Sequence, residues 1–336
     1  MNRTLILFSL LCLVALLAGA YVFLYEPRHG LERVEVEAAP AFHALIFRYD
    51  TELSSQQQLE RLLEQDERLG LRASAFPLTQ DFRLNRNVLF DYSRRAGEVQ
   101  LHARPMPWGL TDAFAAAGDA TPYQYNYVDR GQVLDAYFHN LLPEIAIFDF
   151  NGFYPQGLSL HSTTNRLPWD DDTNYRIIGA AAARAGFRWV SVTSQAFSIG
   201  PDPSKSDPRR FNAYDGEVTS RQQSRWVKTP SDWRSSRSIL VVPTSWRDHY
   251  RSDPSDPEDV RLMYARMLED IDRHWKVAKE NGLALVLLLH PVKYIGRPLH
   301  DDLFLEFRKT LLERANKQAV PVMTFSDYAN QLASMR

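Results

Sequence analysis

The sequence predicts an α/β fold: a (β/α) barrel of about seven parallel strands behind an N-terminal transmembrane helix. Short apolar runs of strand-forming residues alternate with stretches of helical period from residue 42 onward. The strands are apolar on both faces, as in a parallel sheet covered by helices. About seven of them fit a closed or nearly closed barrel better than an open sheet, and the sequence leaves closure undecided. An almost continuous apolar run at residues 4–25 is long enough to span a bilayer.

Residues 1–25 are predicted to be an uncleaved signal anchor. The alternative is a cleaved signal peptide, because residues 18–20 have the small-x-small form of a cleavage site. The apolar run continues beyond this point to Tyr25, so it is longer than the apolar core of most signal peptides. We therefore expect a single-pass protein of the inner (cytoplasmic) membrane whose folded domain faces the periplasm or the cell exterior.

The rest of the chain divides into a polar linker at residues 26–41, with a short strand near 34–36, and a barrel domain at 42–336. The chain has 39 Lys+Arg against 41 Asp+Glu and a formal net charge of -2, which gives no basic surface for nucleic acid. The only cysteine, Cys12, lies in the apolar run, so no disulfide forms within the barrel domain. We expect membrane association through residues 4–25 and no nucleic-acid partner.

The first predicted crossover unit runs from a strand at 44–50 through a helix to a strand at 71–78. Ser55 and Gln58 have the spacing of a capping box at the start of the helix. Gly70 stands where a helix C-cap is expected. A strand, a helix and a strand in this order predict a right-handed parallel crossover.

The same alternation recurs along the chain. Further strands are predicted at 98–102, 144–150, 187–192, 238–242, 283–289 and 320–325. Helices are predicted at 130–142, 173–185, 257–281, 301–318 and 326–332. Two long irregular stretches, 103–129 and 199–237, carry aromatic side chains and are expected to be loops at the barrel rim. Their rings either stack against sugars or anchor the loops by packing.

Four chemically capable side chains stand at predicted strand ends: Asp50, Glu52, His102 and His290. The carboxyl ends of parallel strands meet at one edge of a barrel, so these side chains are expected to lie together. Paired carboxylates can divide their roles, one binding a cation and the other taking a proton. The alternative is that Asp50 and Glu52 only cap the next helix.

Six segments around these residues resemble the polysaccharide deacetylases, carbohydrate esterase family four, over residues 42–332. They are 47–52, which is similar to the first family motif, and 62–76, 97–102, 152–155, 186–191 and 288–291. The resemblance implies a distorted (β/α) barrel and an N-acetylated polysaccharide substrate. It also implies a divalent metal, usually zinc, with Glu52 and His102 as ligands. By the same resemblance, Asp50 is the general base and His290 the general acid.

The sequence departs from the family pattern at two positions. Met106 stands where the family has a second metal-binding histidine, and a thioether is a poor ligand beside oxygen and nitrogen. We expect His161 to supply the replacement ligand. Tyr154 stands where the third motif has the arginine that orients the base, and Arg48 or Arg104 are the candidates to replace it.

Three functions are compatible with these sequence features. The first is a membrane-anchored deacetylase acting on an envelope or exported polysaccharide. The second is a catalytically inactive relative that binds glycan or a partner of the polysaccharide machinery. The third is a glycoside hydrolase that uses Asp50 and a second acid such as Asp149 without metal. Residues 170–172 could supply oxygen ligands, although Asp172 more simply caps the following helix.

Overall fold

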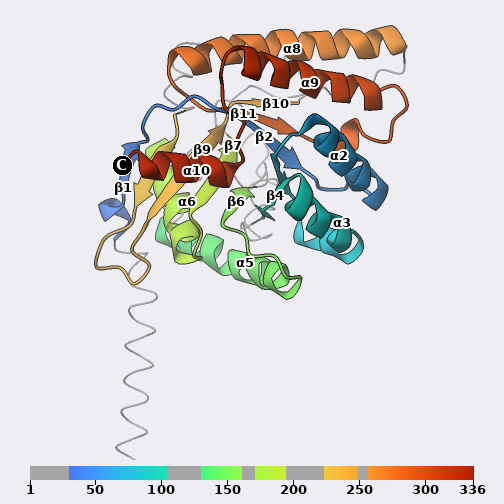
Figure 1. The fold of residues 1–336 in the computed structure, drawn as a ribbon. Coiled ribbons are helices and arrows are strands. Elements are labelled where there is room, and N and C mark those ends of the chain that lie inside the picture. The colour runs from blue at the N-terminus through green and yellow to red at the C-terminus, as the bar shows by residue number, and fades with distance from the viewer. Residues whose placement is uncertain (1–29, 105–129, 161–170, 194–222, 249–255) are drawn as a thin grey trace, which may run out of the picture.

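The structure is a computed structural model that describes residues 30–104, 130–160, 171–193, 223–248 and 256–336 (Figure 1). The strands are β1 (Glu35–Ala38), β2 (Leu45–Asp50), β3 (Ala73–Phe76), β4 (Gly97–Val99), β5 (Leu101–Ala103), β6 (Gly157–Leu160), β7 (Trp189–Thr193), β8 (Arg225–Lys228), β9 (Ser238–Thr244), β10 (Trp246–Arg247) and β11 (Leu285–Leu289). The α-helices are α2 (Gln56–Leu69), α3 (Phe82–Arg95), α5 (Arg130–Phe150), α6 (Asp171–Arg184), α8 (Pro257–Glu280), α9 (Asp301–Lys317) and α10 (Phe325–Ser334). Short 3₁₀ turns include η2 (Thr79–Asp81) and η6 (Pro291–Lys293).

The strands form two sheets that the chain joins at two single residues. One sheet has the order β1-β8-β9-β7-β6-β5 and the other the order β10-β11-β2-β3-β4. Only Gln100 separates β4 from β5, and only Ser245 separates β9 from β10. If the two strands at each junction are counted as one position, the sheets together form a ring of seven parallel strand positions. In order they are β2, β3, β4/β5, β6, β7, β9/β10 and β11. The predicted parallel barrel of about seven strands is confirmed. Outside the ring, β8 pairs antiparallel with β9, and β1 pairs antiparallel with β8.

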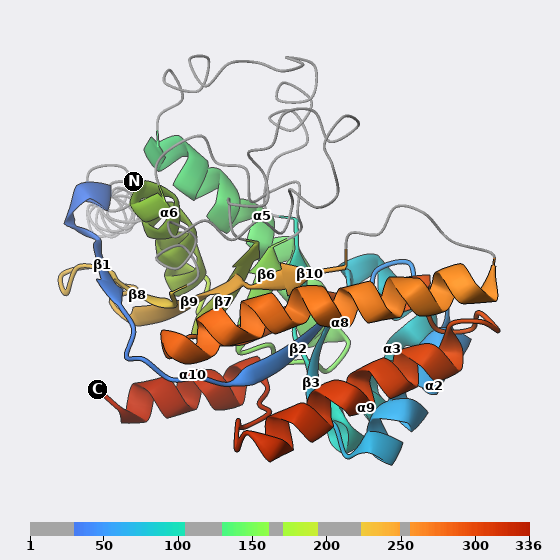
Figure 2. The same ribbon diagram turned by 90° about the horizontal axis from the view of Figure 1, so that it is seen from above.

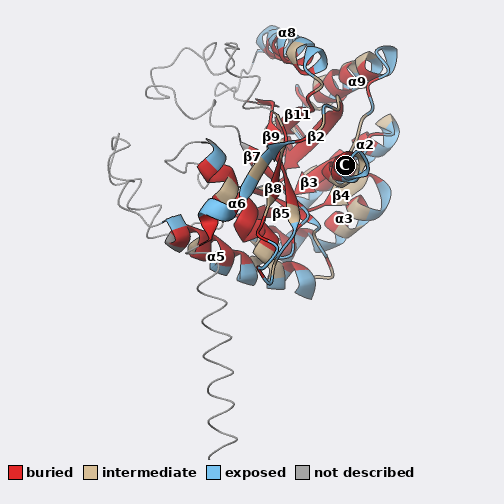
Figure 3. Cartoon of the chain, turned by 90° about the vertical axis from the view of Figure 1, so that its left-hand side faces the viewer, coloured by how far each residue is buried: buried red, intermediate tan, exposed pale blue. Residues whose placement is uncertain are grey.

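Helices cover the outside of the ring. Figures 1 and 2 show α8 and α9 side by side, α2 beside α3, and α5 beside α6. Most strand residues of the ring are buried, whereas β1 and the outward faces of the helices are exposed (Figure 3). Among the described residues no helix is long and apolar enough to cross a membrane. The predicted anchor at 1–25 lies outside the described part of the chain.

The strand residues alternate between two hydrophobic clusters, because successive side chains of a strand point to opposite faces. On β2, Leu45, Phe47 and Tyr49 face the cluster under the helices. The barrel interior holds the second cluster, which includes Ala44, Ile46, Phe76, Trp189, Leu240, Val242, Val286, Phe325, Tyr328 and Leu332. The last three come from α10, and Phe325 stacks on Trp189 at a centroid distance of 4.9 Å. Helix α10 therefore fills the end of the barrel at which the strands begin.

The predicted start and end of the first helix are confirmed. The Ser55 hydroxyl accepts from the backbone N–H of Gln58 at 3.2 Å, and the Gln58 side chain accepts from the backbone N–H of Ser55 at 2.9 Å. Gly70 ends the helix in the left-handed conformation at φ 62°, which glycine adopts without a steric cost.

Several predicted elements are wrong. Residues 144–150 were expected as a strand, but α5 continues through them, with Phe148 buried and Ile147 exposed on a helical period. The strand expected at 320–325 is reduced to a single bridge between Leu45 and Val322, and α10 begins at Phe325. The strand expected at 98–102 is divided between the two sheets. Helix α3 and strands β8 and β10 have no predicted counterpart, and β8 lies within the stretch expected to be a loop.

Candidate active site

Arg48 and Asp50 are the last inward-facing residues of β2. The Arg48 guanidinium donates to both carboxylate oxygens of Asp50, from Nε at 2.8 Å and from Nη2 at 2.9 Å. Its third nitrogen donates to the hydroxyls of Ser191 on β7 at 3.1 Å and Thr244 on β9 at 3.2 Å. Arg48 is fully buried, so this pair is shielded from water. Of the two arginines considered from the sequence, Arg48 is the one that holds Asp50.

The electrostatic surroundings keep Asp50 ionised. Burial alone would raise the pKa of Asp50, but the positive charge of Arg48 and a smaller effect of His102 outweigh it, and the pKa lies below its ordinary value. An ionised carboxylate with fixed geometry is the form that a general base requires. The arrangement excludes the interpretation that Asp50 only caps a helix, since α2 is capped by Ser55.

His102 and Glu52 lie side by side at the same barrel edge. His102 points inward from β5, and its Nδ1 is 2.6 Å from the hydroxyl of Ser159 on β6. Its Nε2 is 3.6 Å from Oε2 of Glu52, which follows β2 in a turn. Nδ1 also lies 3.7 Å from Asp50 Oδ1. Burial lowers the pKa of His102, which favours the neutral imidazole that binds metals.

The donor atoms of Glu52 and His102 fit two ligands of one divalent cation. Zinc bonds to nitrogen and oxygen of about 2.0–2.2 Å in tetrahedral geometry place two ligand atoms about 3.4 Å apart. The observed 3.6 Å between Nε2 and Oε2 is close to this spacing. Within the described ranges no group of three or more His, Cys, Asp or Glu side chains is arranged as a metal site. The predicted third ligand, His161, and the substituted position, Met106, lie outside those ranges.

His290 follows β11 and is held by Asp248, which follows β10. The Nδ1–H of His290 donates to Asp248 Oδ1 at 2.5 Å, and its backbone N–H donates to Oδ2 at 2.7 Å. Asp248 is fully buried. Burial opposes its ionisation, but His290 and Lys293 hold the pKa of the Asp248 carboxyl well below its usual range. With Nδ1 engaged, Nε2 is the nitrogen through which His290 can exchange a proton with a substrate.

Sequence reasoning missed Asp248 because the strand was expected to end at residue 242. It also missed the inward hydroxyls of Ser159 and Ser191. Each of these serines is a single polar residue between two apolar ones in a strand, at 158–160 and 190–192. That alternation is the signal that could have identified them, since it places one polar side chain inside the barrel.

Arg104 and Asp81 lie near Glu52, and Glu144 lies beside Arg104. Arg104 lies 3.9 Å from Glu52 through Nη2, and its backbone N–H donates to the carboxylate of Glu144 on α5. Burial raises the pKa of Glu144 to about 7. Burial also raises the pKa of Asp81 to about 6, with a smaller contribution from the charge of Glu52. Tyr154, at the position of the missing motif arginine, is 78% exposed.

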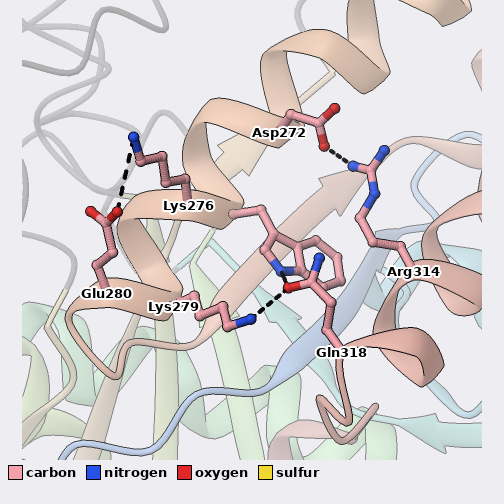
Figure 4. Close-up of a pocket in the computed structure, with 7 residues that line it drawn as sticks. Asp272, Lys276, Lys279, Glu280, Arg314 and Gln318 are labelled. Carbon is pink, nitrogen blue, oxygen red and sulfur yellow. Dashed lines mark hydrogen bonds and ion pairs between the residues drawn. The ribbon is translucent and has the colours of Figure 1, made fainter.

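A hollow of about 670 Å³ between α8 and α9 lies apart from this site (Figure 4). Trp275 forms part of its lining, and Gln318 accepts hydrogen bonds there from Lys279 and from the Trp275 indole. None of the predicted site residues lines it. Its residues at the end of α8 precede β11, so it lies toward the end of the barrel opposite Asp50.

Solved structures share this architecture at low sequence identity. A protein assigned as a polysaccharide deacetylase from Mycobacterium smegmatis is 14% identical with a TM-score of 0.51, over 89% of this chain and 95% of that chain. One from Pseudomonas aeruginosa PAO1 is 15% identical with a TM-score of 0.48, over 87% of this chain and 90% of that chain. Neither a family model nor a curated protein sequence matches. The resemblance found in the motifs is thus confirmed at the level of the fold: the chain is a divergent protein with the barrel of the polysaccharide deacetylases.

Proposed function

We propose that the protein is a membrane-anchored, metal-dependent deacetylase that removes N-acetyl groups from an envelope or exported polysaccharide. One observation carries the proposal. A buried and oriented carboxylate, Asp50, lies at the same barrel edge as the Glu52 and His102 pair and the His290 and Asp248 pair. A base, two ligands of one metal and an acid are the groups that metal-assisted amide hydrolysis requires.

The protein's own side chains perform the proton transfers. Asp50, fixed by Arg48, takes the proton of the attacking water, and His290 gives a proton from Nε2 to the departing amine. Each such transfer is typically worth ~10²–10⁴-fold in rate. Arg48 removes the rotational freedom of the Asp50 carboxylate and keeps it charged.

Glu52 and His102 would hold the metal through Oε2 and Nε2. When bound, a divalent metal such as zinc polarises the amide carbonyl and lowers the pKa of its bound water. Catalytic zinc usually has three protein ligands. We propose His161 as the third ligand, because it directly follows β6, whose Ser159 points into the barrel.

We expect the purified full-length protein to bind about one zinc ion and to release acetate from N-acetylated oligosaccharides. His161→Ala should lower zinc affinity at least about tenfold, the low end of the effect of disturbing ligands or their support. Zinc affinity is measured by competition with a chelator and acetate by a coupled assay. His139→Ala is the matched control, because His139 is exposed on α5.

The competing functions give different results in the same assays. A protein that holds no divalent metal and releases no acetate is the inactive glycan-binding relative. The presence of Met106 and Tyr154 in place of the family's histidine and arginine favours that function. Acetate release by protein from which all metal has been removed contradicts the metal-dependent proposal. The glycoside hydrolase has weaker support, because Asp149 is exposed on α5.

The apolar run at residues 4–25 supports membrane anchoring, with the barrel outside the cytoplasm. The full-length protein should remain in the membrane pellet after a carbonate wash. Protease added to spheroplasts should degrade the barrel if it faces outward. A mature product beginning near Tyr21 contradicts the anchor, since it identifies the segment as a cleaved signal peptide.

A further inference from the structure

One buried carboxylate in the candidate site, that of Asp248, accepts hydrogen bonds from two side chains, His290 and Lys293. Lys293 lies on η6, three residues after His290, and its Nζ donates to Asp248 Oδ1 at 3.2 Å. The same Nζ donates to the backbone carbonyl of Asp248 at 2.8 Å. Asp248 Oδ1 is also the atom that accepts from Nδ1 of His290. The imidazole and the ammonium group therefore share a single carboxylate oxygen.

We propose that Lys293 is a positioning residue that acts on His290 through Asp248, fixing the direction of the ring and making its protonated form a better proton donor. This inference deepens the proposed function and rests on it only for the role of His290 as the acid. Lys293 belongs to none of the motifs that carry the family resemblance, which end at residue 291.

Asp248 and Lys293 together fix the orientation of the His290 ring. Asp248 binds the ring at Nδ1 and the backbone of His290 at the same time, so its carboxylate fixes the residue at two points. Asp248 is itself anchored by its backbone N–H, which donates to the carbonyl of Leu288 on β11 at 3.1 Å. The hydrogen bond from Lys293 to the Asp248 carbonyl links η6, which follows β11, to the segment that follows β10.

The charges around Asp248 also affect how tightly the His290 imidazole holds its proton. A buried carboxylate paired with an imidazolium alone would hold that proton tightly, because opposite charges in contact favour the charged form. A second cation on the same oxygen opposes this, and the proton leaves more readily. In the described part of the chain, the other titratable groups near the pair include Asp50 on β2, whose carboxylate interacts with the His290 charge, and Tyr264 on α8, which interacts with Asp248.

The test measures the protonation of the His290 imidazole directly. Full-length protein labelled with ¹³C-histidine is titrated by NMR, and the His290 signal is assigned with His290→Gln. In Lys293→Met the ring should titrate about one pH unit higher than in the unmodified protein, a tenfold gain in proton affinity. Lys293→Arg keeps the charge and should restore the original value to within about 0.3 unit. Lys309→Met removes an exposed, distant lysine on α9 and should change nothing, since salt screens such charges.

The alkaline limb of the pH–rate profile for acetate release should move upward in parallel in Lys293→Met. An unchanged His290 titration in Lys293→Met, or an equal shift in Lys309→Met, overturns the inference. A shifted titration in a protein that releases no acetate supports the effect of Lys293 on His290 while contradicting the proposed function. The two failures are therefore distinguishable.

Discussion

Asp50→Asn is expected to lower kcat/KM for acetate release by at least about 10²-fold while leaving the zinc content unchanged. The amide cannot accept the proton of the attacking water, yet the proposed ligands Glu52 and His102 remain. The substitution also leaves Arg48 buried without an anion, so a lower melting temperature should accompany the loss. Steady-state kinetics, elemental analysis and a thermal melt measure the three effects.

Asp149→Asn is the matched control for this experiment, because it makes the same chemical change on the exposed face of α5. Its activity should equal that of the unmodified protein. Unchanged activity in Asp50→Asn contradicts the assignment of the base. Loss of activity in both variants, with cleavage of the sugar chain in the unmodified protein, identifies a glycoside hydrolase.

Arg308→Met is expected to lower the free energy of unfolding by about 3–5 kcal/mol, the usual cost of removing one partner from a buried ion pair. Arg308 is fully buried on α9 and donates to Asp66 and Gln65 on α2 and to Tyr49 on β2 at 3.1 Å. Without it the buried Asp66 carboxylate keeps only tyrosine donors. Denaturant unfolding monitored by tryptophan fluorescence measures the loss.

The double variant Arg308→Met with Asp66→Leu separates pairing from packing. If the cost comes from an uncompensated charge, the double variant should be more stable than Arg308→Met alone, because apolar replacements of buried pairs are often neutral. Lys309→Met, one residue further along α9 and exposed, should change stability by less than about 0.5 kcal/mol. A double variant less stable than the single variant would show that packing dominates.

The sequence predicted the barrel because its strands are short, apolar and separated by capped helices. It failed where an apolar run could be read in two ways. Residues 144–150 are rich in apolar side chains, as a strand would be, but they extend α5, in which Phe148 packs against Phe82 and Phe153. Such ambiguity is inherent in short apolar runs, which periodicity alone does not assign.

The grouping of four candidate site residues could be predicted from the sequence, although some of the strands next to them could not. Asp50, Glu52, His102 and His290 could be grouped because parallel strands bring their ends together. Asp248 could not, since it follows the two-residue strand β10, which is too short to show a period. The choice of Arg48 as the partner of Asp50 also required the structure, because it depends on which face of β2 each side chain occupies.

The register of one strand pair has a consequence for how this chain can diverge. Tyr49 pairs with Leu289 between β2 and β11, so the next residues along, Asp50 and His290, emerge as neighbours. Backbone hydrogen bonds between β2 and β11 therefore set the spacing of the proposed base and the proposed acid, and insertions in the connecting loops should leave it unaltered. His102 belongs to the other sheet, on the strand that follows the junction at Gln100. Loss of the proposed metal ligand His102 would therefore leave the strand pairing that places Asp50 beside His290 unchanged.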